Sequence, residues 1–386
     1  MRNNKYLAFH PTMEFLDPVR LLFVQRGERG VVRSRLCFHP VLLLLFFFIP
    51  GILRAQIDDR QAMVEALRWV REAPRDAAQY NYEMTARVRL ILFWAGKENV
   101  GGGYVRRGSS SAEQGAELVQ VLFGSDPAKA PRAINRWGAG TEVFRSRGGG
   151  VSTAPEYSAF FGFMKSSKGK SVSEMQGELS KEKSQGEYLF SAILSRVDSG
   201  RAISLVVPMQ SKVDYNLHQL SEAQSYVLDE FFSNGRQVKK IPSTEQCRRN
   251  AGFLGTVAEL IDAALQGPRT PLSLCYVYDA QVHTLTLRST APLNQLTART
   301  HAPGSGNDAA VVEQNYSDLL EAEFLSETKP SGKHSNFTLV LAKSGKLRGI
   351  PVQIRYQPNW WFQVVLNLCP EATRPEQMQQ DSANNP

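Results

Sequence analysis

The chain has 386 residues, with 45 Lys and Arg against 37 Asp and Glu and a formal net charge of +8. Residues 1–55 hold eight of the basic and three of the acidic residues, so the remainder carries 37 basic against 34 acidic residues, or +3. A nucleic-acid-binding protein needs a concentrated basic face. This near-balanced remainder argues against that class, and we expect no nucleic-acid partner.

Nine consecutive apolar residues, Val41–Ile49, end at the helix breakers Pro50 and Gly51. A membrane-spanning helix needs about 20 apolar residues, whereas the core of a signal peptide needs about 7–15. Basic residues precede the run and Ala55 follows it, as in a cleavable signal. The alternative is a buried core strand or helix. We expect a signal peptide over 31–55, a periplasmic or secreted protein, and no membrane-spanning segment after cleavage.

The signal interpretation leaves residues 1–30 unexplained, because a signal peptide normally starts a few residues before its basic region. No Met lies between Met13 and Met63. We therefore interpret residues 1–30 as a mis-annotated extension, with translation starting near Val31, Val32 or Leu36.

The segment 56–210 is expected to contain an N-terminal helix followed by strands. Asp58 can cap a helix running to Glu72, and apolar residues alternate with polar ones from Tyr80 to Leu92, as in a half-buried strand. Gly101–Gly103 is interpreted as a hairpin connection and Gly138–Gly140 as a turn. Further strands are predicted at 117–123, 157–164, 187–197 and 201–207, with a polar excursion at 165–186.

A helical segment is expected over 211–268, followed by a β-rich one over 269–370. Ser221 with Gln224 and Ser243 with Gln246 form capping boxes, which predict helices over 221–233 and 243–266. A surface loop is predicted at 299–308, and a disordered tail at 371–386. Strands are predicted at 273–278, 282–288, 316–326, 337–342, 350–356 and 360–368.

These elements predict an α+β fold with a large curved antiparallel sheet and a few packed helices. The sequence leaves open whether there is one sheet or two half-barrel-like segments, at 57–210 and 270–370, with helices between them.

Four cysteines occur, at Cys37, Cys247, Cys275 and Cys369. Cys37 precedes the expected cleavage point, so three remain after it. Cys275 and Cys369 lie in or beside predicted strands and are the favoured disulfide pair in an oxidising compartment. Buried free thiols are the open alternative.

No motif indicates catalysis. The chain has no GxSxG and no HExxH, and Gly169-Lys170-Ser171 lacks the first glycine of a phosphate-binding loop. His301 and His334 lie in predicted loops near Asp308, which is compatible with a triad without indicating one. We therefore assign no catalytic residue, metal ligand or cofactor and favour a non-enzymatic protein. An exported hydrolase with an unrecognised site is the alternative.

Aromatic residues of the C-terminal strands suggest a ligand site. Trp360 and Trp361 open the last predicted strand, where neighbouring side chains point to opposite faces. Tyr356 and Phe337 lie on neighbouring strands and can contact each other. These four residues are candidates for binding a lipid or another apolar small molecule in a groove of the sheet. The alternative is that helices cover both faces.

The meander around Arg348–Ile354 resembles half-barrel proteins of the bacterial envelope, including lipoprotein-carrier-like families. The resemblance covers residues 310–370 and implies a curved antiparallel sheet that shields helices and holds acyl chains. It assigns no functional residue. A third interpretation is an envelope assembly or adhesion component, whose exposed strand edges pair with another envelope protein.

Overall fold

The computed structural model describes residues 68–370 with internal gaps, the longest at 166–187, 226–238 and 303–309. Several predicted segments lie outside the described residues. They are the extension, the signal peptide, the polar tail, the excursion after Lys165, residues 303–308 of the expected 299–308 loop, and most of the helices expected at 58–72 and 221–233.

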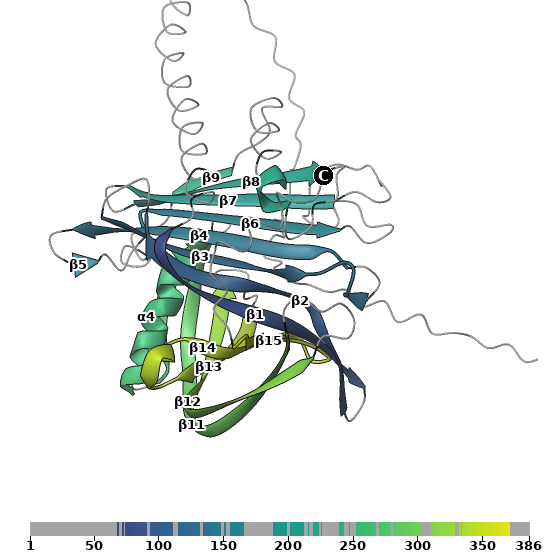
Figure 1. Ribbon diagram of the computed structural model, residues 1–386. Coiled ribbons are helices and arrows are strands. Elements are labelled where there is room, and N and C mark those ends of the chain that lie inside the picture. Colours follow the sequence, from purple (N-terminus) through teal and green to yellow (C-terminus); the bar gives the residue numbers. More distant parts are fainter. Residues whose placement is uncertain are drawn as a thin grey trace, which may run out of the picture.

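One antiparallel sheet organises the described part of the chain (Figure 1). Pairing runs from β10 through β15 and then continues from β1 to β9, with β5 joined only to β4. The contact between β15 and β1 makes a single sheet of the two β-rich segments. The strands are β1 (Arg75–Leu90), β2 (Phe93–Ser109), β3 (Ala116–Ser125), β4 (Arg136–Arg147), β5 (Gly150–Val151), β6 (Tyr157–Lys165), β7 (Tyr188–Asp198), β8 (Arg201–Ser211), β9 (Lys239–Pro242), β10 (Leu272–Tyr278), β11 (Gln281–His301), β12 (Val311–Thr328), β13 (His334–Ala342), β14 (Pro351–Asn359) and β15 (Phe362–Leu368).

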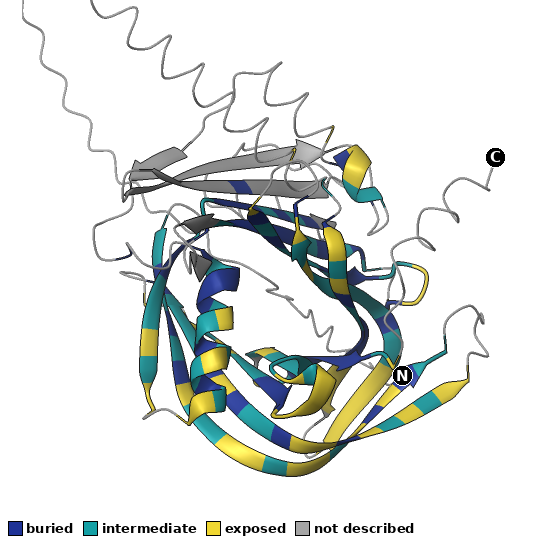
Figure 2. Ribbon diagram, turned by 60° about the vertical axis from the view of Figure 1, so that its left-hand side comes forward, coloured by how far each residue is buried: buried dark blue, intermediate teal, exposed yellow. Residues whose placement is uncertain are grey.

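The sheet curls around helix α4 (Phe253–Gln266), as Figure 2 shows. The curl brings Tyr278, at the end of β10, against Phe160 of β6, with ring centroids 5.3 Å apart. Ile193 of β7 packs in the same cluster. β9 and β10 remain at the two ends of the strand order and do not pair with each other. The structure therefore confirms the expected large curved antiparallel sheet. Side-chain packing, rather than strand pairing, brings β10 against β6 and β7.

Helix α4 packs on the inner side of the curl. Its buried residues Leu260 and Ala264 join a cluster with Leu285 and Leu287 of β11 and Phe324 of β12. The helix was expected to begin at Ser243, but its N-cap is Gly252. The predicted capping box at Ser243 and Gln246 lies outside the described residues. Among the described residues, no helix is long and apolar enough to cross a bilayer.

Two glycine-containing segments that the sequence suggested as turns lie within strands. Gly101–Gly103 sits inside β2, paired with β1 on one side and β3 on the other. A Cβ on Gly103 would lie 1.7 Å from the backbone oxygen of Leu122, and one on Gly140 of β4 would lie 2.5 Å from the Phe160 ring. These glycines allow a neighbouring backbone or ring to come close to the strand, rather than allowing the chain to turn.

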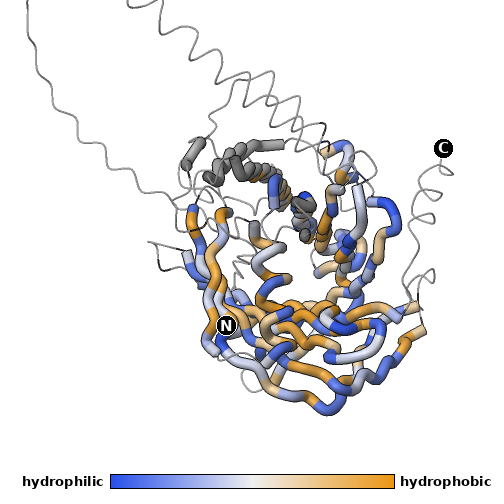
Figure 3. Tube along the Cα trace, turned by 90° about the vertical axis from the view of Figure 1, so that its left-hand side faces the viewer, coloured by the Kyte–Doolittle hydropathy of each residue, from blue (hydrophilic) through white to orange (hydrophobic). Residues whose placement is uncertain are grey.

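The hairpin of β11 and β12 is much longer than predicted. β11 continues past the expected end at 288 and includes the first residues of the expected loop. A register shift at Leu287/Ser289 and a positive φ at Asp318 interrupt the regular pairing. Beyond them, Ala298 and Tyr316 pack in a cluster with residues of β1, β13 and β15. Figure 3 shows apolar and polar segments alternating along the strands of this part of the molecule.

Candidate functional site

The face of the sheet that α4 covers, here called the inner face, can be traced from Glu142 of β4. Its carboxylate accepts hydrogen bonds from the backbone N–H groups of Leu254 (2.9 Å) and Gly255 (2.8 Å) in the first turn of α4. Val119 of β3 and Ser158 of β6 lie directly opposite Glu142 on the neighbouring strands. Because paired residues point to the same side of a sheet, Val119 and Ser158 also lie on the inner face.

A row of apolar residues crosses six strands on this face. Successive pairings join Tyr80 of β1 to Val105, Val105 to Val121, Val121 to Gly140, Gly140 to Phe160 and Phe160 to Ile193. Gly140 has no side chain, and the Phe160 ring occupies that space. We call this set the inner apolar row: Tyr80, Val105, Val121, Gly140, Phe160 and Ile193.

Burial along β3 shows which face retains exposed apolar surface. Residues on the side away from α4, such as Leu118 (0% exposed), are buried. The intervening residues Val119, Val121 and Phe123 on the inner face are only partly buried. Strand interiors normally bury their apolar side and expose their polar side. Here the partly exposed inner face is apolar, so it can accept apolar surface from a ligand.

Small residues adjoin the inner apolar row on the same face. Tyr82 pairs with Gly103, Gly103 with Phe123, Phe123 with Gly138, and Gly138 with Gly162. Tyr82 and Phe123 therefore flank a position without a side chain, and their rings meet edge to face with centroids 5.7 Å apart. The glycines limit how much side-chain volume this part of the inner face carries.

Glu142 holds α4 in its position beside this row. The carboxylate takes the N–H groups of the second and third helical residues, which a side chain at the N-cap usually satisfies. Gly252 at the N-cap supplies no side chain, and a Cβ there would lie 2.4 Å from a carboxylate oxygen of Glu142. Burial raises the pKa of Glu142 to about 7, and hydrogen bonds from the helix and from Ser158 oppose that rise.

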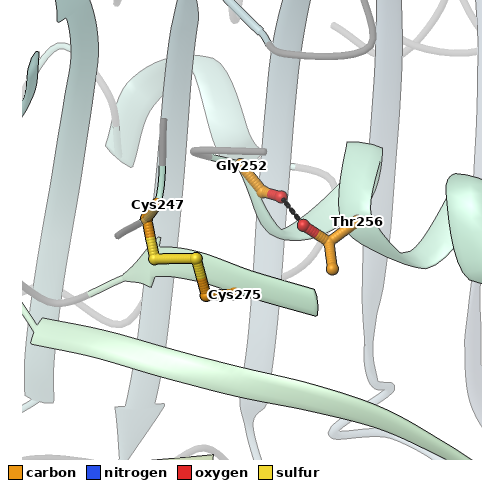
Figure 4. The surroundings of a disulfide bond; sticks show 4 residues. All are labelled: Cys247, Gly252, Thr256 and Cys275. Atoms are coloured by element: carbon orange, nitrogen blue, oxygen red, sulfur yellow. Dashed lines mark hydrogen bonds between the residues drawn. A yellow bond between two sulfur atoms is a disulfide. The ribbon is translucent and has the colours of Figure 1, made fainter. Parts of the chain in front are cut away.

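The disulfide bond joins Cys247 to Cys275, so the expected pairing of Cys275 with Cys369 is wrong. The bond links the segment before α4 to β10, next to the first turn of the helix, where the Thr256 hydroxyl donates to the Gly252 carbonyl (Figure 4). Cys369 keeps a free thiol. Sequence position could not distinguish the pairs, because the curl of the sheet decides which cysteines meet.

The four aromatic residues proposed from sequence do not share one location. Phe337 and Tyr356 face each other across β13 and β14, and the Phe337 ring stacks on Phe324, with centroids 4.9 Å apart, in the cluster under α4. Trp360 and Trp361 lie in the turn before β15 rather than in the strand. Trp360 is 67% exposed, whereas Trp361 packs against the core. Whether any of the four binds a ligand stays a prediction.

A polar cluster lies on the opposite, outer face. His301, at the end of β11, uses its backbone N–H (2.7 Å) and Nδ1 (2.8 Å) to contact the carboxylate of Glu83 on β1. Asn367 of β15, which is paired with Glu83, donates to the carbonyl of Arg299. These bonds fasten the far half of the β11–β12 hairpin to the sheet.

The outer cluster lacks the arrangement of a nucleophile and base. Among the described residues, no serine hydroxyl or cysteine thiol hydrogen-bonds to His301. Burial, and to a smaller extent Glu83, raises the pKa of the Cys369 thiol to about 11. A nucleophilic cysteine requires a lowered pKa, so this thiol is poorly suited to attack. The described residues also contain no group of three or more side chains placed to hold a metal ion.

His283, unlike the half-buried His301, is fully buried, and it stabilises the β10–β11 hairpin. Nε2 lies 3.0 Å from the Tyr278 carbonyl and therefore donates to it, which leaves Nδ1 to accept from the Thr328 hydroxyl at 3.1 Å. The ring also stacks on Tyr276, with centroids 5.0 Å apart. Burial lowers the pKa of His283 to about 4, so the ring is neutral at physiological pH.

Comparison with solved structures finds chains of similar fold. No family model matches the sequence, and no curated protein matches it. A crystal structure described as a beta-barrel-like protein of domain of unknown function DUF1849 from Brucella abortus is similar in structure. Its TM-score is 0.36 at 10% sequence identity, over 75% of this chain and 95% of that chain.

Proposed function

We propose that this protein binds an apolar ligand of the acyl-chain class against the inner apolar row, next to α4. The observation that carries the proposal is the exposure pattern of β3, in which the apolar residues of the inner face are more exposed than the residues of the other face. Val119, Val121 and Phe123 remain partly exposed on the inner face, while the other face of the strand is buried. Burying apolar surface contributes about 25 cal/mol per Å². An extended chain of methylene groups would lie along such a row without needing polar partners.

The arrangement of polar groups favours a binding role over hydrolysis. The buried carboxylate of Glu142, two residues from Gly140 of this row, is occupied by the N–H groups of α4. His301 is tied to Glu83 on the opposite face. General acid–base catalysis needs a titratable side chain within hydrogen-bond reach of the substrate. The inner apolar row itself contains no such group except the Tyr80 phenol.

A fluorescent fatty-acid displacement assay tests the proposal, with Val121→Asp as the variant. A carboxylate in the row would face the acyl chain, and we expect the affinity to fall at least tenfold, which corresponds to about 1.4 kcal/mol. Val311→Asp is the matched control, because Val311 starts β12 and is already 44% exposed. Circular dichroism separates lost binding from lost folding. Failure of the unaltered protein to bind acyl chains, or equal binding by both variants, would sink the proposal.

We further infer that the chain is exported, as the apolar run at 41–49 suggests. The disulfide between Cys247 and Cys275 supports this inference, since such bonds persist mainly in oxidising compartments. Mass spectrometry of the protein from the periplasm or medium is the test, and an N-terminus at Gln56 is expected. Recovery only from the cytoplasm, with free thiols at Cys247 and Cys275, would contradict export.

A further inference from the structure

Exposed apolar side chains are concentrated at one end of the sheet. Of the five large hydrophobic residues that are exposed in the described part of the chain, four lie in the β1–β2 hairpin or the β14–β15 turn. The fifth is Val311, in β12. Their exposed fractions are 38% for Val88, 63% for Phe93, 38% for Trp94 and 67% for Trp360.

Backbone contacts place these residues next to one another. Arg89 of β1 pairs with Trp94 of β2, and Val88 pairs with Ala95. The Arg89 N–H also donates to the carbonyl of Trp361 at 2.7 Å, which brings the β14–β15 turn beside the hairpin. We call this end of the molecule the aromatic tip, defined by Val88, Phe93, Trp94 and Trp360. Figure 1 shows the paired ends of β1 and β2 projecting at the lower right.

The aromatic tip is basic as well as apolar. Arg87, Arg89 and Lys97 are exposed, and no Asp or Glu occurs between Glu83 and Glu98. Within the described residues, no carboxylate forms an ion pair with Arg87 or Arg89. Both arginines share the face of the hairpin on which Trp94 lies, since Arg89 pairs directly with Trp94. Exposed aromatic rings and unpaired cations are therefore presented together.

We propose that the aromatic tip docks on the surface of a lipid bilayer that contains anionic lipids. Tryptophan side chains favour the boundary between headgroups and acyl chains, and each Lys or Arg near an anionic surface adds about 1 kcal/mol. A projecting hairpin end with one neighbouring turn fits a deformable bilayer. A specific protein interface normally uses about 20–30 residues on each side, which is more than this tip presents.

Membrane docking does not depend on the proposed ligand site, although the two are compatible. Val88, Met84 and Tyr82 alternate with residues of the other face along β1, so all three side chains point to the inner face. A bilayer at the aromatic tip would thus adjoin the strands that carry the inner apolar row. The Val121→Asp variant separates the two proposals, because it alters the row and leaves the tip unchanged.

Flotation with vesicles tests the docking surface, using the protein as isolated from its own cells. Vesicles of phosphatidylcholine with phosphatidylglycerol are compared with vesicles of phosphatidylcholine alone. We expect binding to the anionic vesicles. The double variant Trp94→Ala/Trp360→Ala should lower the partition coefficient about tenfold or more. Arg87→Gln/Arg89→Gln should lower it about 30-fold on anionic vesicles.

Matched controls keep the result interpretable. Val311→Ala removes the exposed apolar residue outside the tip, and Arg288→Gln removes an exposed arginine of β11. Both should bind anionic vesicles as the unaltered protein does, and so should Val121→Asp. The proposal is overturned if the unaltered protein stays unbound on anionic vesicles, or if the tip variants bind as tightly as the controls. If Val121→Asp alone lost vesicle binding, the lipid contact would be assigned to the inner face instead.

Discussion

Two buried ionisable side chains, Glu142 and His283, have opposite effects on how stability depends on pH. Burial raises the pKa of Glu142 to about 7 from an ordinary value of 4.5, so the folded state binds its proton more tightly than the unfolded state. The stability that this group contributes is present below pH 4.5 and is lost as the pH rises through about 7. For His283 the pKa falls from 6.5 to about 4. Its contribution is present above pH 6.5 and is lost as the pH falls through about 4.

Replacing Glu142 by Gln should remove the first of these dependences. Between pH 5 and pH 8, the free energy of unfolding of the unaltered protein should fall relative to that of Glu142→Gln, by up to about 3 kcal/mol. Urea unfolding at several pH values measures the difference. His283→Gln is the comparison, since it should change the slope at lower pH and with the opposite sign. Parallel curves for the unaltered protein and Glu142→Gln would show that Glu142 is not the titrating group.

At the scale of secondary-structure elements, β2 shows how a strand of seventeen residues is fitted between two neighbours. The strand carries Gly101, Gly102 and Gly103 in succession, opposite a register shift between Met84 and Ala86 of β1. Glycine in a strand often marks a bend or a close approach of another backbone. The backbone oxygen of Leu122 occupies the space that a side chain at Gly103 would need.

Gly103→Ala should therefore destabilise the protein by about 3 kcal/mol, because a backbone oxygen cannot rotate away as a side chain can. Gly96→Ala is the matched control in the same strand, where the nearest atom is the flexible Cγ of Arg87 at 3.3 Å. Urea unfolding midpoints compare the two variants. Equal midpoints for both variants would mean that β2 tolerates a side chain at Gly103.

At the scale of the whole molecule, several kinds of contact hold the two halves of the chain together, among them strand pairing, a helix cap and a disulfide. The pairing of β15 with β1 makes the sheet continuous. Glu142 of β4 binds the first turn of α4, whose other end packs with β10 to β13. The disulfide between Cys247 and Cys275 closes a loop of 28 residues that contains α4. The inner face is therefore bordered by residues from both halves.

Removing the disulfide should loosen this arrangement without abolishing the sheet. For a loop of this length, chain entropy alone predicts a loss of about 3–4 kcal/mol in Cys247→Ser/Cys275→Ser. Thermal unfolding with and without reductant measures the effect. Cys369→Ser is the control, because that thiol is unpaired and reductant should not alter its contribution. If reductant destabilised Cys247→Ser/Cys275→Ser as much as the unaltered protein, the stabilisation could not be assigned to the disulfide between Cys247 and Cys275.

Local pattern predicted the strands, because an alternating apolar sequence can bury one face only in an extended conformation. The strands near 117–123, 157–164 and 201–207 and the C-terminal meander were predicted close to their observed positions. β4 was missed because its glycines resemble turn residues. Only the structure shows that the ring of Phe160 lies over Gly140 and needs a residue without a side chain there. Strand alternation gives two faces and does not say which one a helix will cover.

The sequence by itself thus determined the large antiparallel sheet, the near-neutral charge beyond residue 55 and the expectation of export. Only the tertiary structure decided that Cys247 pairs with Cys275, that Glu142 caps a helix more than a hundred residues away, and that Val121 and Trp94 belong to different surfaces. The physical reason is that these contacts depend on the curl of the sheet. Curvature arises from bulges, glycines and packing across many strands, and no local pattern of residues encodes which distant groups it brings together.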